Sequence, residues 1–135
     1  MKITHLKRSS KPVAATGFGG YDVCANPYVG CQFGCTYCYV RMFVTDTEAE
    51  WGDFVRIRDK AITASEVRKA SGLKLVIGTM TDPYQPVERQ ERNTRHLLEE
   101  IERLPEELRP SDIGLFTRSP IVLDDADLLV RLNVR

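Results

Sequence analysis

The stretch from Asn26 to Val40, NPYVGCQFGCTYCYV, holds three of the four cysteines of this 135-residue chain. Cys31, Cys35 and Cys38 are spaced as C-x3-C-x2-C, and the glycines before Cys31 and Cys35 give the backbone room to wrap closely around a bound group. Clustered cysteines in a chain without a secretory signal are more typical of metal ligands or redox groups than of structural disulfides. The spacing therefore predicts a metal centre in this loop.

Two kinds of metal centre compete for the motif. A structural zinc ion needs four protein ligands, usually in two separated pairs, and the remaining cysteine, Cys24, lies at an atypical gap from Cys31. An iron–sulfur cube suits three thiolates better, because they hold three irons and leave the fourth open to a ligand from outside the protein. We expect a [4Fe-4S] cluster, with Cys24 as a small buried hydrophobe. A zinc-binding structural domain and a redox role are the alternatives.

The rest of the chain alternates between strand and helix patterns. Apolar runs predict strands near residues 21–25, 54–58, 73–78 and 112–117, and helical patterns cover residues 35–44, 63–71, 86–104 and 121–132. Thr63 and Glu66 have capping-box spacing, and Gly72 stands at a helix end. Residues 1–21 are expected to form a lead-in with little regular structure. The order of elements predicts a parallel α/β fold.

The unusual segments of the sequence follow the predicted strands. The cysteine loop comes after the first of them, GTMTDPYQP (residues 78–86) after the strand at 73–78, and FTRSP (residues 116–120) closes the last. In parallel α/β folds the loops after the carboxyl ends of the strands build the functional site. We therefore expect the three segments to meet.

Together, NPYVGCQFGCTYCYV, GTMTDPYQPVE and TRSPIVLDDADLL resemble the radical S-adenosylmethionine (SAM) enzymes, in the branch related to spore photoproduct lyase, over roughly residues 22–131. The resemblance implies an enzyme in which a [4Fe-4S] cluster, reduced by a flavodoxin or ferredoxin type of electron donor, cleaves SAM to a 5′-deoxyadenosyl radical. It also implies a partial TIM-type barrel. Residues 22–135 would form the N-terminal half of that domain, with about three βα units. The substrate stays open.

The resemblance assigns a role to residues in all three segments. The cluster ligands would be Cys31, Cys35 and Cys38, and the SAM contacts would be Tyr37 and Tyr39 at the adenine, Thr79, Thr81 and Asp82 at the amino group, and Arg118 at the carboxylate. The photoproduct lyases carry a hydrogen-donating cysteine where this chain has Thr79. A hydroxyl is a far poorer hydrogen-atom donor than a thiol, which argues against repair of thymine dimers.

Composition limits the partners. Lys and Arg together equal Asp and Glu at 19 each, so no overall basic field indicates nucleic acid. No segment has the length and hydropathy of a membrane span or a signal peptide, and we expect a cytoplasmic protein without membrane contact. A half-barrel would leave a strand edge unpaired, which predicts self-association. The non-enzymatic alternative is an iron–sulfur module for electron transfer or scaffolding.

Overall fold

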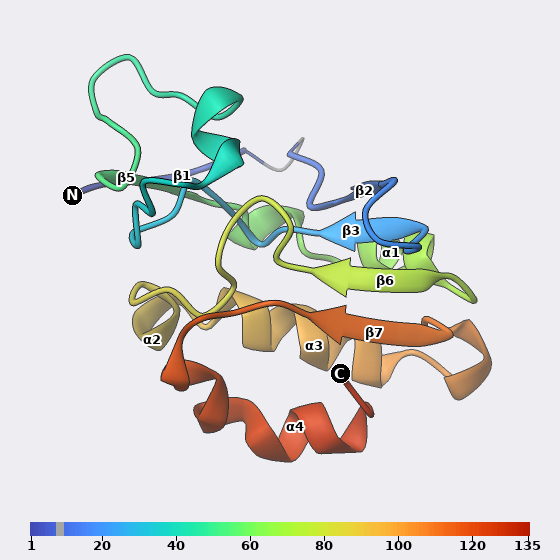
Figure 1. The fold of residues 1–135 in the computed structure, drawn as a ribbon. Helices are drawn as coiled ribbons and strands as arrows, with labels where there is room; N and C mark the ends of the chain where they lie inside the picture. The colour runs from blue at the N-terminus through green and yellow to red at the C-terminus, as the bar shows by residue number, and fades with distance from the viewer. Residues whose placement is uncertain (8–9) are drawn as a thin grey trace.

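Three parallel strands form the centre of the computed structural model, which describes residues 1–7 and 10–135 (Figure 1). They are β3 (Val23–Ala25), β6 (Lys74–Ile77) and β7 (Asp112–Leu115), and β2 (Val13–Ala15) runs antiparallel along β3, in the order β2-β3-β6-β7. The strands predicted near residues 21–25, 73–78 and 112–117 are confirmed. Because β3, β6 and β7 point the same way, the loops that follow them leave the sheet at the same end.

A smaller sheet lies beside the first, in the order β1-β5-β4. It consists of β1 (Lys2–His5), β5 (Phe54–Ile57) and β4 (Tyr28–Val29). The strand predicted at residues 54–58 is confirmed as β5. The expectation of little regular structure in residues 1–21 is wrong, because β1 and β2 both lie there; residues 8 and 9 of this segment are outside the described part. Both strands are short. Because β1 forms by pairing with residues about fifty positions away, the sequence around it does not indicate a strand.

The helix predicted at residues 63–71 is confirmed as α1 (Ala64–Val67), continued by a short 3-10 turn over Arg68–Ala70. The Thr63 side chain accepts a hydrogen bond of 3.2 Å from the backbone N–H of Glu66, as a helix cap does. Gly72 has a φ of +71°, the left-handed conformation that ends many helices. Local capping signals therefore decide the bounds of this helix.

The helix predicted at residues 86–104 is divided into α2 (Glu88–Glu91) and α3 (Asn93–Arg103). Arg92 separates them with a φ of +54°, which a non-glycine residue rarely adopts. The buried carboxylate of Glu88 accepts hydrogen bonds from the backbone N–H groups of Thr94 (2.9 Å) and Arg95 (3.1 Å), and from the Tyr28 hydroxyl. This tertiary cap satisfies the first free N–H groups of α3 and stabilises the break.

Two further helix predictions need correction. Residues 35–44 form turns and a 3-10 segment over Tyr39–Met42 instead of a helix, because the chain turns around the cysteines. Residues 121–132 begin as a 3-10 segment over Pro120–Asp125, and only α4 (Ala126–Arg131) is α-helical. The cysteine loop is thus held by contacts with other segments and not by a helix of its own.

The main hydrophobic core lies between the β2-β3-β6-β7 sheet and the helices, and Figure 1 shows α3 and α4 together along one side of this sheet. Its fully or almost fully buried members include Ala25, Leu75, Ile77, Leu97, Leu98, Ile101 and Leu128. Burial of this apolar surface holds the strands, and thereby their loops, in place. Within residues 1–7 and 10–135, no helix has the length and apolar character needed to cross a membrane.

The outer edge of β7 carries a short pairing with the end of the chain. Leu115 donates a backbone hydrogen bond of 2.8 Å to Arg135, and Arg135 donates one of 2.9 Å to Ile113. This is the pattern of a parallel strand pair. The edge that was expected to be unpaired is therefore partly covered, while the closure of the sheet into part of a barrel stays a prediction.

Candidate functional site

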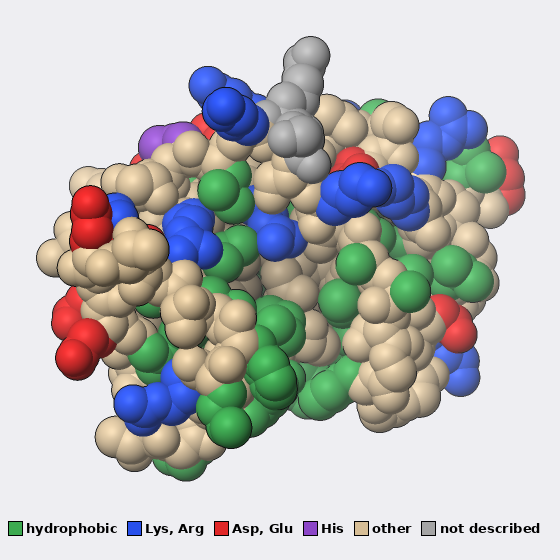
Figure 2. Space-filling model, turned by 90° about the horizontal axis from the view of Figure 1, so that it is seen from above, with side chains coloured by type: hydrophobic (Ala, Val, Ile, Leu, Met, Phe, Trp, Pro, Cys, Tyr) green, Lys and Arg blue, Asp and Glu red, His purple; other side chains and the backbone are tan. Residues whose placement is uncertain are grey.

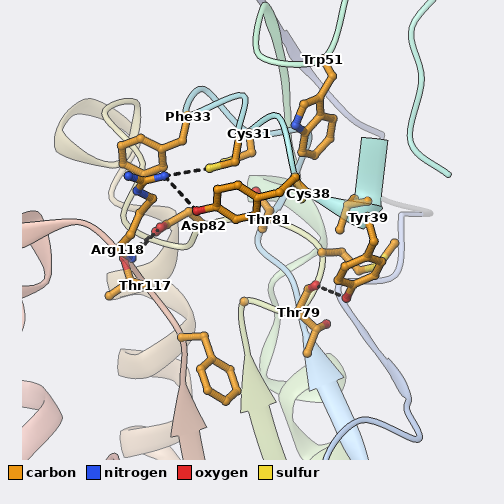
Figure 3. Close-up of a pocket in the computed structure, with 16 residues that line it drawn as sticks. Cys31, Phe33, Cys38, Tyr39, Trp51, Thr79, Thr81, Asp82, Thr117 and Arg118 are labelled. Carbon is orange, nitrogen blue, oxygen red and sulfur yellow. Dashed lines mark hydrogen bonds between the residues drawn. The ribbon is translucent and has the colours of Figure 1, made fainter. Parts of the chain in front are cut away.

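The three predicted segments meet at one cavity of about 540 Å³ beyond the carboxyl ends of β3, β6 and β7 (Figure 3). All nine residues predicted to hold the cluster or SAM line this cavity: Cys31, Cys35, Tyr37, Cys38, Tyr39, Thr79, Thr81, Asp82 and Arg118. Seen from above, the molecule has hydrophobic side chains gathered around a central hollow (Figure 2). The volume lies in the range of pockets for small molecules and cofactors.

Close backbone contacts shape the cysteine loop. Gly30 has a φ of +88°, and a Cβ atom there would lie 2.5 Å from the carbonyl oxygen of Phe54. Gly34 has a φ of +55°, and a Cβ atom there would lie 3.0 Å from the Cα of Gly52. The loop can pack this tightly against the chain around residues 51–54 only because both positions lack a side chain.

The three thiols differ in exposure. Cys31 is buried, whereas Cys35 and Cys38 are partly exposed. Burial raises the pKa of the Cys31 thiol, and the backbone N–H groups of Phe33 and Asp82 offset part of this rise. Cys24, by contrast, lines a different cavity, and its sulfur lies 3.7 Å from the side-chain nitrogen of Asn26. Only the cysteines of the C-x3-C-x2-C motif therefore belong to the main site.

The arrangement of these thiols bears on the kind of metal centre. Across the described part of the chain, no three His, Cys, Asp or Glu side chains converge so that they could hold a single metal ion. A cube cluster does not need such convergence, because each thiolate binds a different iron. With Cys24 at another cavity, a fourth cysteine ligand for tetrahedral zinc is absent as well. The three thiols of the motif line one cavity and Cys24 lines another, and the kind of metal centre stays a prediction.

Arg118 links the end of β7 to the cysteine loop. Its Nη1 lies 2.9 Å from the Cys35 sulfur and 3.4 Å from the Tyr37 hydroxyl, and its guanidinium stacks over the Phe33 ring at 5.5 Å (Figure 3). The hydrogen bond to Cys35 raises the pKa of Arg118. The side chain remains exposed, so it places a positive charge at the mouth of the cavity. A guanidinium there is suited to a carboxylate ligand.

Asp82 serves as a connection between two loops. One carboxylate oxygen accepts hydrogen bonds from the backbone N–H of Tyr84 (2.8 Å) and the hydroxyl of Thr117 (2.6 Å). The other accepts the backbone N–H of Arg118 at 2.9 Å. These bonds fix the loop after β6 to the loop after β7. Asp82 is thus hydrogen-bonded to protein groups on both loops, and its contact with the SAM amino group stays a prediction.

Thr81 also has protein partners for its hydroxyl. The hydroxyl donates to the carbonyl oxygen of Gly30 at 2.5 Å and accepts a hydrogen bond of 2.8 Å from the side chain of Gln85. Gln85 in turn accepts the backbone N–H of Gln32 at 2.9 Å, and the Gln32 side chain accepts the backbone N–H of Val87 at 2.6 Å. The two glutamines cross-link the cysteine loop to the loop after β6, and sequence reasoning missed both.

Thr79 and Tyr39 line the side of the main cavity that lies across from Arg118 (Figure 3). The Tyr39 hydroxyl donates to the Thr79 carbonyl oxygen at 2.8 Å (Figure 3), and the Asn26 side chain donates to the Thr79 hydroxyl at 3.1 Å. Asn26 also accepts the backbone N–H of Met80 at 2.9 Å. Tyr37, in contrast, is 82% exposed. Asn26 therefore holds two loops together, as Gln32 and Gln85 do. In the sequence, Asn26 before Pro27 indicated only a turn, so this function was missed.

Comparison with known proteins gives one relative of undescribed function. The chain is 29% identical over 134 residues to the uncharacterized protein MJ0683 of Methanocaldococcus jannaschii, a match that covers 98% of this chain and 49% of that protein. The chain thus spans about half the length of the curated relative it matches. No protein-family model and no solved structure matches.

Proposed function

We propose that the chain carries the N-terminal half of a radical SAM domain, spanning residues 22–135 of a partial barrel, in a cytoplasmic enzyme. The observation that supports this most is that all nine predicted ligand residues, from three separate segments, line one cavity at the carboxyl ends of parallel strands. A cavity lined by thiols and by one cationic side chain provides what a metal cluster and the carboxylate group of an amino acid need.

Cys31, Cys35 and Cys38 would hold the [4Fe-4S] cluster, and Arg118, with Tyr37 and Tyr39, would bind SAM in the same cavity. When bound, the cluster would supply the electron, received from an external one-electron donor, that cleaves SAM to a 5′-deoxyadenosyl radical. The remaining polar residues of the site hold these ligand residues in place. Asp82 holds the backbone of Arg118, and Gln85 holds the cysteine loop through Gly30 and Gln32.

The second candidate function is an iron–sulfur module for electron transfer, and it shares the three cysteine ligands. The presence of Arg118 beside Cys35 favours the SAM enzyme, because an electron-transfer site has no need of a cation at the mouth of a large cavity. The zinc-binding alternative is weaker, since the three thiols do not converge on one position and Cys24 lies elsewhere.

Anaerobic reconstitution separates these functions. The purified chain is incubated with iron, sulfide and a thiol reductant, then iron and sulfide are counted and the reduced protein is examined by EPR with and without SAM. We expect the stoichiometry of a [4Fe-4S] cluster and a change in its EPR signal on addition of SAM. A cluster whose signal ignores SAM would support electron transfer, and binding of zinc in place of iron would support the structural domain.

A further inference from the structure

A second cavity, of about 200 Å³, adjoins the main one. Met80 lines both cavities, and Asn26, in the wall of the second, is hydrogen-bonded to Thr79 in the wall of the first. The other side chains that line it are apolar or basic apart from Cys24 and Tyr28, and no Asp or Glu is among them. The two basic residues are Arg58 and Lys11. The cavity is therefore small and basic, and it lies next to the main site.

Arg58 reaches this cavity from the end of β5 without a carboxylate partner among the described residues. Its Nη1 donates to the carbonyl oxygens of Lys11 (2.9 Å) and Asn26 (3.4 Å). Its Nε is buried and has no hydrogen-bond partner in the described part of the chain. A buried donor of this kind costs free energy unless a ligand or water satisfies it.

The nearby carboxylate is already engaged. Glu66 forms an ion pair of 2.7 Å with Lys69 and accepts the backbone N–H of Val13 at 3.2 Å. Arg56, two residues before Arg58, provides the contrast within the same strand region, since its guanidinium pairs with Asp46 at 3.1 Å. Arg58 is thus a cation held in place by carbonyl oxygens and not by an ion pair. Burial lowers its pKa, and the Glu66 carboxylate offsets part of this effect.

We propose that Arg58 binds an oxyanion, a carboxylate or phosphate group, of the molecule on which the enzyme acts. The Arg58 side chain lines the cavity, and a guanidinium group forms charge-assisted hydrogen bonds with anionic groups of this kind. A cavity of about 200 Å³ accommodates the anionic group but not a whole substrate, whose remainder would extend past Met80 into the main cavity. Calling this ligand the substrate rests on the proposed function; the anion site itself does not.

The test uses the chain without any cluster and follows the arginine Nε–Hε signals by ¹H–¹⁵N NMR. Inorganic phosphate and acetate are titrated separately, with sodium chloride at matched ionic strength as the reference. We expect the Arg58 signal, identified by its loss in Arg58→Lys, to shift saturably with phosphate or with acetate but not with chloride. If only phosphate gives a saturable shift, the natural ligand carries a phosphate group, and if only acetate does, it carries a carboxylate.

Substitutions give the second readout. Arg58→Gln should weaken binding of the effective anion by about tenfold or more, in line with loss of a charged hydrogen bond. Arg56→Gln should bind as the unaltered chain does, because Arg56 is already paired. Absence of a saturable shift with both anions in the unaltered chain would overturn the proposal, even if Arg58→Gln failed to fold. Because no cluster is present, this result is independent of whether the chain binds iron.

Discussion

The Asp82 carboxylate accepts a 2.9 Å hydrogen bond from the backbone N–H of Arg118, a residue 36 positions later in the chain. The guanidinium of the same arginine lies 2.9 Å from the Cys35 sulfur. Arg118 is therefore fixed at both ends, by the loop after β6 at its backbone and by the cysteine loop at its side chain. The three segments of the site form one connected unit, and disturbance of one should be felt in the others.

Removal of Asp82 should weaken this unit. Asp82→Ala would leave the N–H groups of Tyr84 and Arg118 without their acceptor, and we expect a loss of about 1–3 kcal/mol in the free energy of unfolding, measured by urea denaturation. Asp124→Ala is the matched control, since Asp124 is exposed and should change stability by no more than about 0.5 kcal/mol. Equal stability of the two variants would show that the Asp82 connection is unimportant.

The cysteines should separate into two classes. Single Cys31→Ala, Cys35→Ala and Cys38→Ala variants should each fail to retain a [4Fe-4S] cluster after anaerobic reconstitution, as seen in visible absorption and iron content. Cys24→Ala should retain it, because Cys24 lines the second cavity. Loss of the cluster in Cys24→Ala would mean that all four irons have protein ligands and would contradict the open iron on which the SAM proposal depends.

Gly30 should tolerate no side chain. Gly30→Ala places a Cβ atom 2.5 Å from the Phe54 carbonyl oxygen, so the loop must shift and both stability and cluster binding should fall. Gly20 has a similar φ of +83°, with nothing within 4 Å of its Cβ position. Gly20→Ala therefore has the same backbone cost of about 1–2 kcal/mol without the clash. The difference in melting temperature between the two variants therefore measures the cost of the contact with the Phe54 carbonyl oxygen. Identical melting temperatures would show that this contact costs nothing.

Glu88 should matter more for stability than for chemistry. Glu88→Ala removes the cap of α3 and the partner of the Tyr28 hydroxyl, and we expect a loss of about 2–4 kcal/mol in the free energy of unfolding. Glu88→Gln keeps an acceptor and should lose less. Denaturation of both variants beside the unaltered chain measures the difference, and an equal loss would show that the side-chain amide cannot replace the carboxylate.

The pH dependence tests the same group. Burial raises the pKa of Glu88 above its ordinary value of 4.5, so the folded chain binds this proton more tightly than the unfolded chain does. The resulting stabilisation is complete below pH 4.5 and is lost as the pH rises through the raised pKa. Relative to Glu88→Gln, the unaltered chain should therefore gain stability on acidification. A constant difference across this range would contradict the raised pKa.

Sequence patterns predicted the elements whose cause is local. The apolar runs of β6 and β7, and the Thr63 cap of α1, can be recognised in the sequence because a continuous apolar run and a capping residue are local signals. The break at Arg92 could not be predicted, since it depends on the Glu88 carboxylate and its contacts with Tyr28 and the start of α3. Short strands such as β1 depend likewise on a distant partner.

The candidate site divides in the same way. The motif residues were placed correctly around one cavity, because parallel strands bring their following loops together. The groups that hold the loops to each other were missed. Gln32, Gln85 and Asn26 are ordinary polar residues in sequence, and their function as cross-links becomes visible only when buried donors and acceptors are paired.

The antiparallel strand β2 bears on how the chain folds during synthesis. In the folded sheet β2 pairs with β3, β3 with β6, β6 with β7, and Arg135 with β7, so each segment has a partner that precedes it in the sequence. In this sheet every arriving segment finds a partner that has already left the ribosome. Because synthesis is slower than the formation of local structure, the sheet can grow strand by strand in one direction as the chain emerges.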